Sequence, residues 1–136
     1  MNDRLVIFII EDSKIISSLM SNLLSREFDV TVFTFESGES ALETLNSVTP
    51  DIILLDYHLD SRNKHNINGQ EFMIILKKLK VLVPVIILSG QSNKEVMAHL
   101  IQLGAIDYVS KDDEYFLDNA IDSTRRAIEL INSKRS

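Results

Sequence analysis

Two apolar segments of this sequence end in acidic residues. The segment 5–10, "LVIFII", is followed by Glu11 and Asp12, and the segment 52–55, "IILL", is followed by Asp56. Burying an unpaired carboxylate is costly. Each of these groups therefore needs water or a partner charge at the point where the apolar segment stops.

Two further apolar segments end in residues that could complete a site. The segment 84–88 is followed by Ser89 and Gly90, and the segment 105–109 leads through one serine into Lys111. Converging carboxylates repel one another unless a cation lies between them, and Mg²⁺ prefers carboxylates, waters and phosphate oxygens. Carboxylates, Mg²⁺, a lysine and a hydroxyl together suit phosphoryl transfer, in which an aspartate can be the nucleophile.

Apolar runs and amphipathic segments alternate along the chain. Continuous apolar or β-branched runs predict buried strands at 5–10, 30–35, 52–55, 84–88 and 105–109. Apolar residues at helical spacing predict helices at 13–27, 37–46, 67–80, 92–103 and 112–132. We expect Ser37 to cap the second helix and Gly104 to end the fourth.

The same spacing predicts which side of each helix faces the core. In 13–27 the apolar stripe comprises Ile16, Leu19, Met20, Leu23 and Leu24. Ile15 is interpreted as widening this stripe, with a kinase-docking surface as the alternative. In 67–80 the stripe comprises Phe72, Ile75, Leu76 and Leu79. In 112–132 it comprises Phe116, Leu117, Ala120, Ile121, Ile128 and Ile131.

Five strand–helix units in succession predict an α/β domain with one parallel sheet covered by helices on both faces. The crevice of such a sheet lies beyond the carboxyl ends of its strands, where the polar residues above are placed. The 136 residues are 45% hydrophobic and 25% charged, without cysteine, which suits one globular domain with no disulfide or thiolate chemistry. We expect the domain to cover 1–136, with 132–136 as a solvated tail or the start of a linker.

Charge and hydropathy argue against two kinds of partner. A net charge of −6 disfavours direct binding to the phosphates of nucleic acid. The apolar runs fall short of the about 20 residues that a membrane span needs, and the first run lacks the cleavage site of a signal peptide. The expected location is the cytoplasm, with neither nucleic acid nor membrane as a direct partner.

Together the motifs resemble the receiver domain of two-component response regulators. They share one placement, the carboxyl end of a strand, and comprise "ED" (Glu11, Asp12), the last residue of "DIILLD" (Asp56), "VIILSG" (Ser89) and "DYVSK" (Tyr108, Lys111). Each motif alone is weak, but all of them in register within five strand–helix units are specific. The resemblance implies a doubly wound (βα)5 sheet with the flavodoxin-like strand order 2-1-3-4-5.

The resemblance also implies a phosphorylation site. Asp56 would accept a phosphoryl group from a histidine kinase or a histidine phosphotransfer protein. Glu11, Asp12 and Asp56 would hold Mg²⁺, with the backbone carbonyl of His58 as a further ligand. The domain would catalyse only its own phosphorylation and slow dephosphorylation, and it would not be an enzyme in the ordinary sense.

The other matching residues would read the phosphoryl group. Lys111 would pair with Asp56 and then with the phosphoryl group, Ser89 would bond a phosphoryl oxygen, and Tyr108 would change rotamer with it. The shift between two conformations would be presented by the fourth helix, fifth strand and fifth helix. A downstream protein or a fused output domain would bind there, and this face is compatible with dimerisation.

Two features depart from the family's common pattern. The loop 58–68 is longer than usual and lacks the usual proline; it is interpreted as an idle insertion, with a cover over the site as the alternative. Lys111 is followed by Asp112 in place of the usual proline. A cis bond without proline costs about 2.5–4 kcal/mol, so we expect a trans bond there.

Three other functions compete with this interpretation. A haloacid-dehalogenase-like phosphatase would need a second acid two residues after the nucleophile, where this chain has His58. A pseudo-receiver, a purely structural interaction module, would not need the complete set of site residues. A nucleotide or flavin binder would need a glycine-rich phosphate loop, and the chain has only four glycines.

Overall fold

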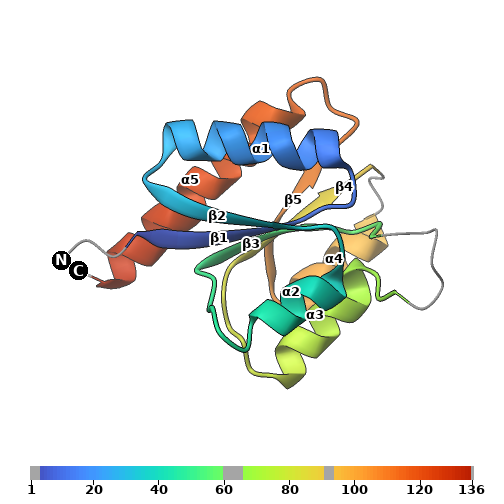
Figure 1. Ribbon diagram of the computed structural model, residues 1–136. Coiled ribbons are helices and arrows are strands. Elements are labelled where there is room, and N and C mark those ends of the chain that lie inside the picture. Colours follow the sequence, from blue (N-terminus) through green and yellow to red (C-terminus); the bar gives the residue numbers. More distant parts are fainter. Residues whose placement is uncertain (1–3, 60–65, 91–93, 136) are drawn as a thin grey trace.

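The computed structural model describes residues 4–59, 66–90 and 94–135. In these ranges five strands alternate with five helices (Figure 1). The strands are β1 (Leu5–Ile10), β2 (Val30–Phe35), β3 (Ile52–Asp56), β4 (Val85–Ser89) and β5 (Ala105–Ser110). The helices are α1 (Lys14–Glu27), α2 (Gly38–Thr44), α3 (Gly69–Lys78), α4 (Lys94–Gln102) and α5 (Phe116–Arg135).

The strands form one parallel sheet in the order β2-β1-β3-β4-β5. This confirms the predicted doubly wound topology and places β2 at an edge, next to β1 and away from β3 and β4. Helices α1 and α5 cover one face of the sheet, and α2, α3 and α4 cover the other (Figure 1). None of the helices within the described ranges is long and apolar enough to cross a bilayer.

Each central strand sends alternate side chains into two apolar clusters, because successive residues of a strand point to opposite faces. Ile7, Ile9 and Leu54 belong to the cluster under α1 and α5. Phe8 and Leu55 belong to the cluster under α2, α3 and α4. Full burial of such a side chain stabilises the fold by about 1.5–3 kcal/mol. The two clusters therefore hold each strand in its register, and this determines where the strand ends.

The two predicted helix signals are confirmed. The Ser37 hydroxyl accepts a hydrogen bond from the N–H of Ser40 at the start of α2. Gly104 has φ +112° just beyond α4, a conformation that glycine adopts at little cost. The first two positions of the predicted fourth helix, 92 and 93, lie outside the described residues.

The last helix begins and ends later than predicted. It was expected over 112–132 and is found at Phe116–Arg135. Asp113 accounts for the late start, because its carboxylate accepts the N–H of Tyr115 at 2.8 Å and holds a turn. A short aspartate side chain competes in this way with helical hydrogen bonding.

Three apolar residues assigned to helix stripes face solvent instead. The exposed fractions of Ile15, Leu19 and Leu79 are 74%, 47% and 57%. The buried row of α1 contains Ser17 and Met20, and at about 100° per residue Ile15 lies on the opposite side of the helix from Ser17. The interpretation of Ile15 as a core residue is therefore wrong.

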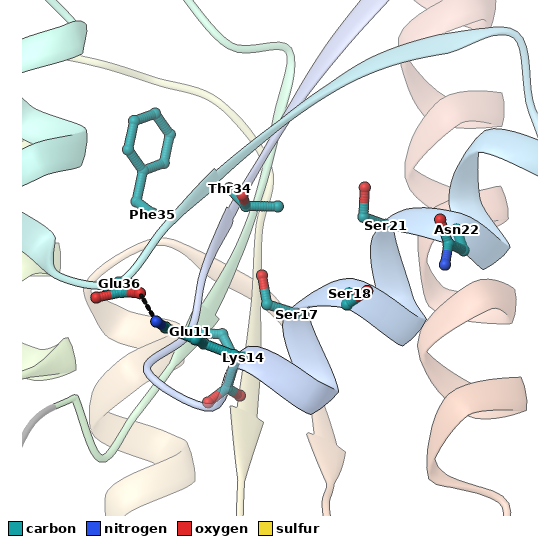
Figure 2. Close-up of a pocket in the computed structure, with 9 residues that line it drawn as sticks. All are labelled: Glu11, Lys14, Ser17, Ser18, Ser21, Asn22, Thr34, Phe35 and Glu36. Atoms are coloured by element: carbon teal, nitrogen blue, oxygen red, sulfur yellow. Dashed lines mark ion pairs between the residues drawn. The ribbon is translucent and has the colours of Figure 1, made fainter.

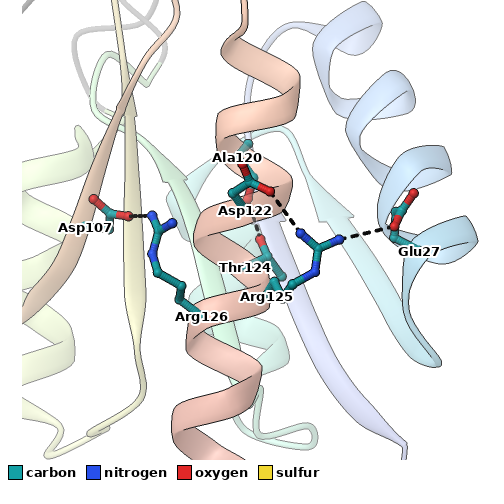
Figure 3. Close-up of polar contacts among 7 residues, drawn as sticks. All are labelled: Glu27, Asp107, Ala120, Asp122, Thr124, Arg125 and Arg126. Atoms are coloured by element: carbon teal, nitrogen blue, oxygen red, sulfur yellow. Dashed lines mark hydrogen bonds and ion pairs between the residues drawn. The ribbon is translucent and has the colours of Figure 1, made fainter.

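Helix α5 is tied to its neighbours by two arginines (Figure 3). Arg125 contacts Glu27 of α1 at 3.3 Å, and its guanidinium lies 5.5 Å from the centre of the Phe28 ring. Arg126 contacts Asp107 of β5 at 2.8 Å. Exposed pairs of this kind contribute up to about 1 kcal/mol each, so they fix the position of α5 more than they stabilise the fold.

Candidate functional site

Three strands run directly from apolar core into charged residues on the same side of the sheet. In β1 the residue two positions after Ile9 is Glu11, and in β3 the residue two positions after Leu54 is Asp56. Lys111 likewise lies two positions after the last residue of β5 whose side chain enters the cluster under α1 and α5. Because side chains alternate along a strand, the period of the core directs all three charges toward the α1 and α5 side.

These three side chains meet in a buried ion-pair cluster. The Lys111 ammonium lies 2.6 Å from Glu11 Oε1 and 3.1 Å from Asp56 Oδ1. The side chains of Glu11, Asp56 and Lys111 are 0%, 2% and 18% exposed. One cation therefore serves two carboxylates that water scarcely reaches.

Burial and the neighbouring charges shift the pKa of each group. Burial, followed by the charge of Asp56, raises the pKa of Glu11 to about 7. Burial also raises the pKa of Asp56, although the Lys111 charge and the His58 N–H partly offset it. Burial alone would lower the pKa of Lys111, but its contacts with Glu11 and Asp56 outweigh burial and raise it. When both carboxylates are ionised, the cluster carries one more negative charge than Lys111 can neutralise.

Asp12 adds a third carboxylate to the cluster. Glu11, Asp12 and Asp56 each offer an oxygen, and these oxygens lie within 4.8 Å of one another. Hard divalent cations bind such oxygen sets, and the two buried carboxylates share a single ammonium, that of Lys111. The donor set therefore fits Mg²⁺, which would supply positive charge to a phosphate.

Backbone groups hold the carboxylates in place. The N–H of Ser13 donates to Glu11 Oε2 at 3.0 Å, and the N–H of His58 donates to Asp56 Oδ1 at 3.0 Å. A Cβ at Gly69 would lie 2.8 Å from the carbonyl oxygen of Asp56. Only glycine fits this approach of α3 to the end of β3.

The sequence did not point to the supporting roles of Ser13 and Gly69. One signal for Gly69 was present, since it lies inside an Asn68–Glu71 capping box that fixes the start of α3. The close approach to β3 depends on tertiary packing and has no local signature.

The structure also places the other predicted site residues. Ser89 is buried at the end of β4, beside β3, and its carbonyl accepts the N–H of Lys111 at 2.7 Å. Tyr108 is half-buried in β5 and packs on the cluster under α2, α3 and α4. His58 is exposed, and its ring lies 4.9 Å from that of Tyr57.

Two departures from the family pattern have different outcomes. Among the described residues no peptide bond is cis, so the bond between Lys111 and Asp112 is trans, as predicted. Of the long loop 58–68, residues 60–65 lie outside the described residues. Its interpretation as an idle insertion or a cover stays a prediction.

A cavity of about 300 Å³ lies next to the cluster, between α1 and β2 (Figure 2). Hydroxyl side chains of α1 line it, together with the Lys14–Glu36 ion pair at 3.6 Å. Glu11 also lines this cavity, whereas Asp56 and Lys111 do not. The cavity is therefore a polar notch beside the charged cluster and not the space in which Asp56 would react.

Comparison with known proteins identifies the family of this domain. The model of the response regulator receiver domain family matches residues 7–122. The DNA-binding transcriptional regulator NtrC of Escherichia coli K12 is 30% identical over 128 residues, which are 92% of this chain and 25% of that protein. The protein-glutamate methylesterase/protein-glutamine glutaminase of Treponema denticola is 33% identical over 112 residues, 77% of this chain and 28% of that protein.

The solved structures agree as well. The crystal structure of NtrX from Brucella abortus has a TM-score of 0.82 at 28% identity, covering 98% of this chain and 28% of that one. The chain belongs to the response regulator receiver domain family, the signalling domain of two-component systems. It spans about a quarter of the length of the curated relatives described above.

Proposed function

We propose that this domain is a phosphorylation-dependent switch in which Asp56 accepts a phosphoryl group from a histidine kinase or a histidine phosphotransfer protein. The observation that carries the proposal is the buried cluster, in which Asp56 lies 3.1 Å from Lys111 and within a carboxylate set that suits Mg²⁺. In the transfer, a carboxylate oxygen of Asp56 bonds to phosphorus as the phosphorus–nitrogen bond of the donor breaks. The electron pair of that bond stays on the donor imidazole, which takes up a proton.

Each member of the cluster has a part in this proposal. Glu11, Asp12 and Asp56, with the carbonyl of His58, would hold Mg²⁺, which would supply positive charge for the phosphoryl oxygens. Lys111 provides a second positive charge that is fixed to the end of β5. Because little covalent chemistry is asked of the protein, positioning and charge neutralisation account for most of the catalysis.

Intact-mass measurement with a small phosphodonor tests the proposal. Incubation with acetyl phosphate and Mg²⁺ should add one phosphoryl group to the wild type, and EDTA or Asp56→Asn should abolish the adduct. Asp107→Asn is the matched control, because Asp107 is a strand aspartate that pairs with Arg126 outside the cluster. An adduct that persists in Asp56→Asn, or none under any condition, would refute the phosphoacceptor role.

We further propose that Ser89 and Tyr108 transmit phosphorylation to the face formed by α4, β5 and α5. Ser89 lies in β4, next to β3, and Tyr108 lies in β5, the next strand beyond it. A partner protein or a fused output domain would bind this face. Amide NMR of the phosphorylated domain should show shifts in α4 and β5 that shrink in Ser89→Ala. Shifts confined to the ends of β1 and β3 would contradict this part of the proposal.

Partner and compartment complete the proposal. NtrC is named as a DNA-binding transcriptional regulator, which supports a fused output domain as one form of partner. Ile15 and Leu19 of α1 expose apolar surface near the end of β1, which supports docking of the phosphodonor there. We also propose the cytoplasm as the compartment, where histidine kinases have access to ATP.

A further inference from the structure

The end of α3 and the turn into β4 form a basic and apolar surface at the end of the sheet opposite to Asp56. Lys77, Lys78 and Lys80 are all exposed, and among the described residues none of them takes part in an ion pair. Leu79 and Leu82, within the same turn, are 57% and 88% exposed. We call these five residues the α3–β4 corner.

The corner adjoins an apolar hollow between α3 and α4. This cavity has a volume of about 170 Å³ and is lined mainly by apolar side chains, including Leu76, Val81 and Leu103. Lys77 and Leu82 of the corner lie at its rim. A hollow of this size suits one large apolar side chain inserted from outside.

The turn holds a lysine in a conformation that glycine normally takes. The N–H of Lys80 donates to the carbonyl of Lys77 at 3.1 Å, and the N–H of Val81 donates to that of Leu76 at 3.0 Å. This is the hydrogen-bond pattern of a Schellman motif, in which the residue at the Lys80 position is usually glycine. Lys80 has φ +59°, so the chain carries a strained lysine where an unstrained residue would end the helix better.

Helix electrostatics explain only part of the corner. Lys77 and Lys78 lie in the last turn of α3, where cations favour the helix dipole. That effect does not require Lys80 beyond the helix end, nor the exposure of Leu82. The stretches 73–85 and 102–104, which hold the residues that line the hollow, contain no acidic residue, although the chain as a whole has a net charge of −6.

We infer that the α3–β4 corner binds an acidic segment of a partner protein that carries one large apolar side chain. The apolar side chain fills the hollow, and acidic residues on either side of it pair with Lys77 and Lys80. Concavity favours a protein segment over a membrane, because a flat bilayer surface leaves a hollow unfilled. Such mixed surfaces, with an apolar centre and a charged rim, are typical of protein recognition. This site is separate from the proposed phosphorylation chemistry.

An NMR titration with a designed peptide tests the inference. The probe is a capped peptide with one phenylalanine flanked on each side by two glutamates, and the control peptide has serine in place of phenylalanine. The probe should shift amide signals at the corner and around the hollow. The control peptide should bind at least tenfold more weakly. Equal binding of both peptides, or no saturable binding of the probe, overturns the inference.

Two variants separate binding from folding. Leu82→Ser should weaken binding of the probe peptide at least tenfold. Because Leu82 is exposed, the substitution should leave the urea midpoint nearly unchanged. Lys80→Gly should weaken binding of the probe peptide several-fold, because it removes a charge. It should also raise the urea midpoint, because it removes backbone strain. Unchanged probe binding in both variants overturns the inference. Two other results would also overturn the inference. If the wild type binds phosphatidylserine vesicles and either variant abolishes that binding, the corner serves a membrane. If the wild type self-associates in the ultracentrifuge and either variant abolishes the association, the corner serves a second copy of the chain.

Discussion

The buried Glu11 should make the metal-free protein less stable as the pH rises. Its pKa is raised from the ordinary value of 4.5 to about 7 by burial and by the charge of Asp56. A raised pKa in the folded state means that the folded protein holds this proton more tightly than the unfolded chain does. The stabilisation is therefore fully present below pH 4.5 and is lost as the pH rises through about 7.

The magnitude follows from the difference between the two pKa values. At 1.36 kcal/mol for each pH unit, it amounts to about 3 kcal/mol in all, of which about 2 kcal/mol is lost between pH 5.5 and 8.5. Asp56, whose pKa is also raised, acts in the same direction. Lys111 does not oppose this, because its pKa is raised above 10.5 and its contribution is constant throughout this range.

Urea unfolding at pH 5.5, 6.5, 7.5 and 8.5 in the presence of EDTA measures the effect. The wild type should lose about 2 kcal/mol across this range, and Glu11→Gln should lose much less. Glu36→Gln is the control, because Glu36 is an exposed carboxylate paired with Lys14, and its slope should match the wild type. Mg²⁺ should restore stability above pH 7, since it binds the ionised carboxylates. Parallel curves for wild type and Glu11→Gln would refute the reasoning.

Three further substitutions test the site and the α3–β4 corner. Gly69→Ala should lower the free energy of unfolding by about 1–3 kcal/mol, because its Cβ would lie 2.8 Å from backbone atoms. Gly90→Ala, whose nearest contact would be 3.9 Å away, should change it by less than about 0.5 kcal/mol, and equal urea midpoints would contradict this. Lys80→Gly should raise the free energy of unfolding by about 1 kcal/mol; a lower midpoint would refute the strain. Lys111→Met should lower it by about 3 kcal/mol at pH 8 and by less at pH 5.5, where Glu11 is protonated. Equal losses at both pH values would show that Lys111 does not act through charge.

Much of the site could be predicted because it lies where regular strands end. Five apolar runs and the rule for parallel sheets were sufficient to place Glu11, Asp56 and Lys111 at one end of the molecule. The confirmed strand order then makes β1 and β3 neighbours, which brings two of these charges side by side. The prediction succeeded because side chains alternate between the two faces of the sheet. The alternation that places apolar side chains in the core also determines to which face the next charged side chain points.

The errors arose where local pattern does not specify a contact. Ile15 has the polarity of a core residue, but only the position of the buried row, defined by Ser17 and Met20, shows that it faces away. The start of α5 depends on Asp113, whose side chain takes a hydrogen bond that the helix would otherwise use. The role of Gly69 depends on how closely α3 approaches β3, and that distance is set by packing between segments far apart in sequence.

The cluster has a property that its position in the core imposes. Burial that fixes Glu11 and Asp56 also removes the water that would solvate their charges, so it favours a proton or an added cation at the site. Lys111 joins the ends of three strands, through its side chain to β1 and β3 and through its N–H to the Ser89 carbonyl of β4. A phosphoryl group on Asp56 would attract the Lys111 ammonium away from Glu11. Because Lys111 directly follows β5, we expect such a movement to act on the strand that carries Tyr108.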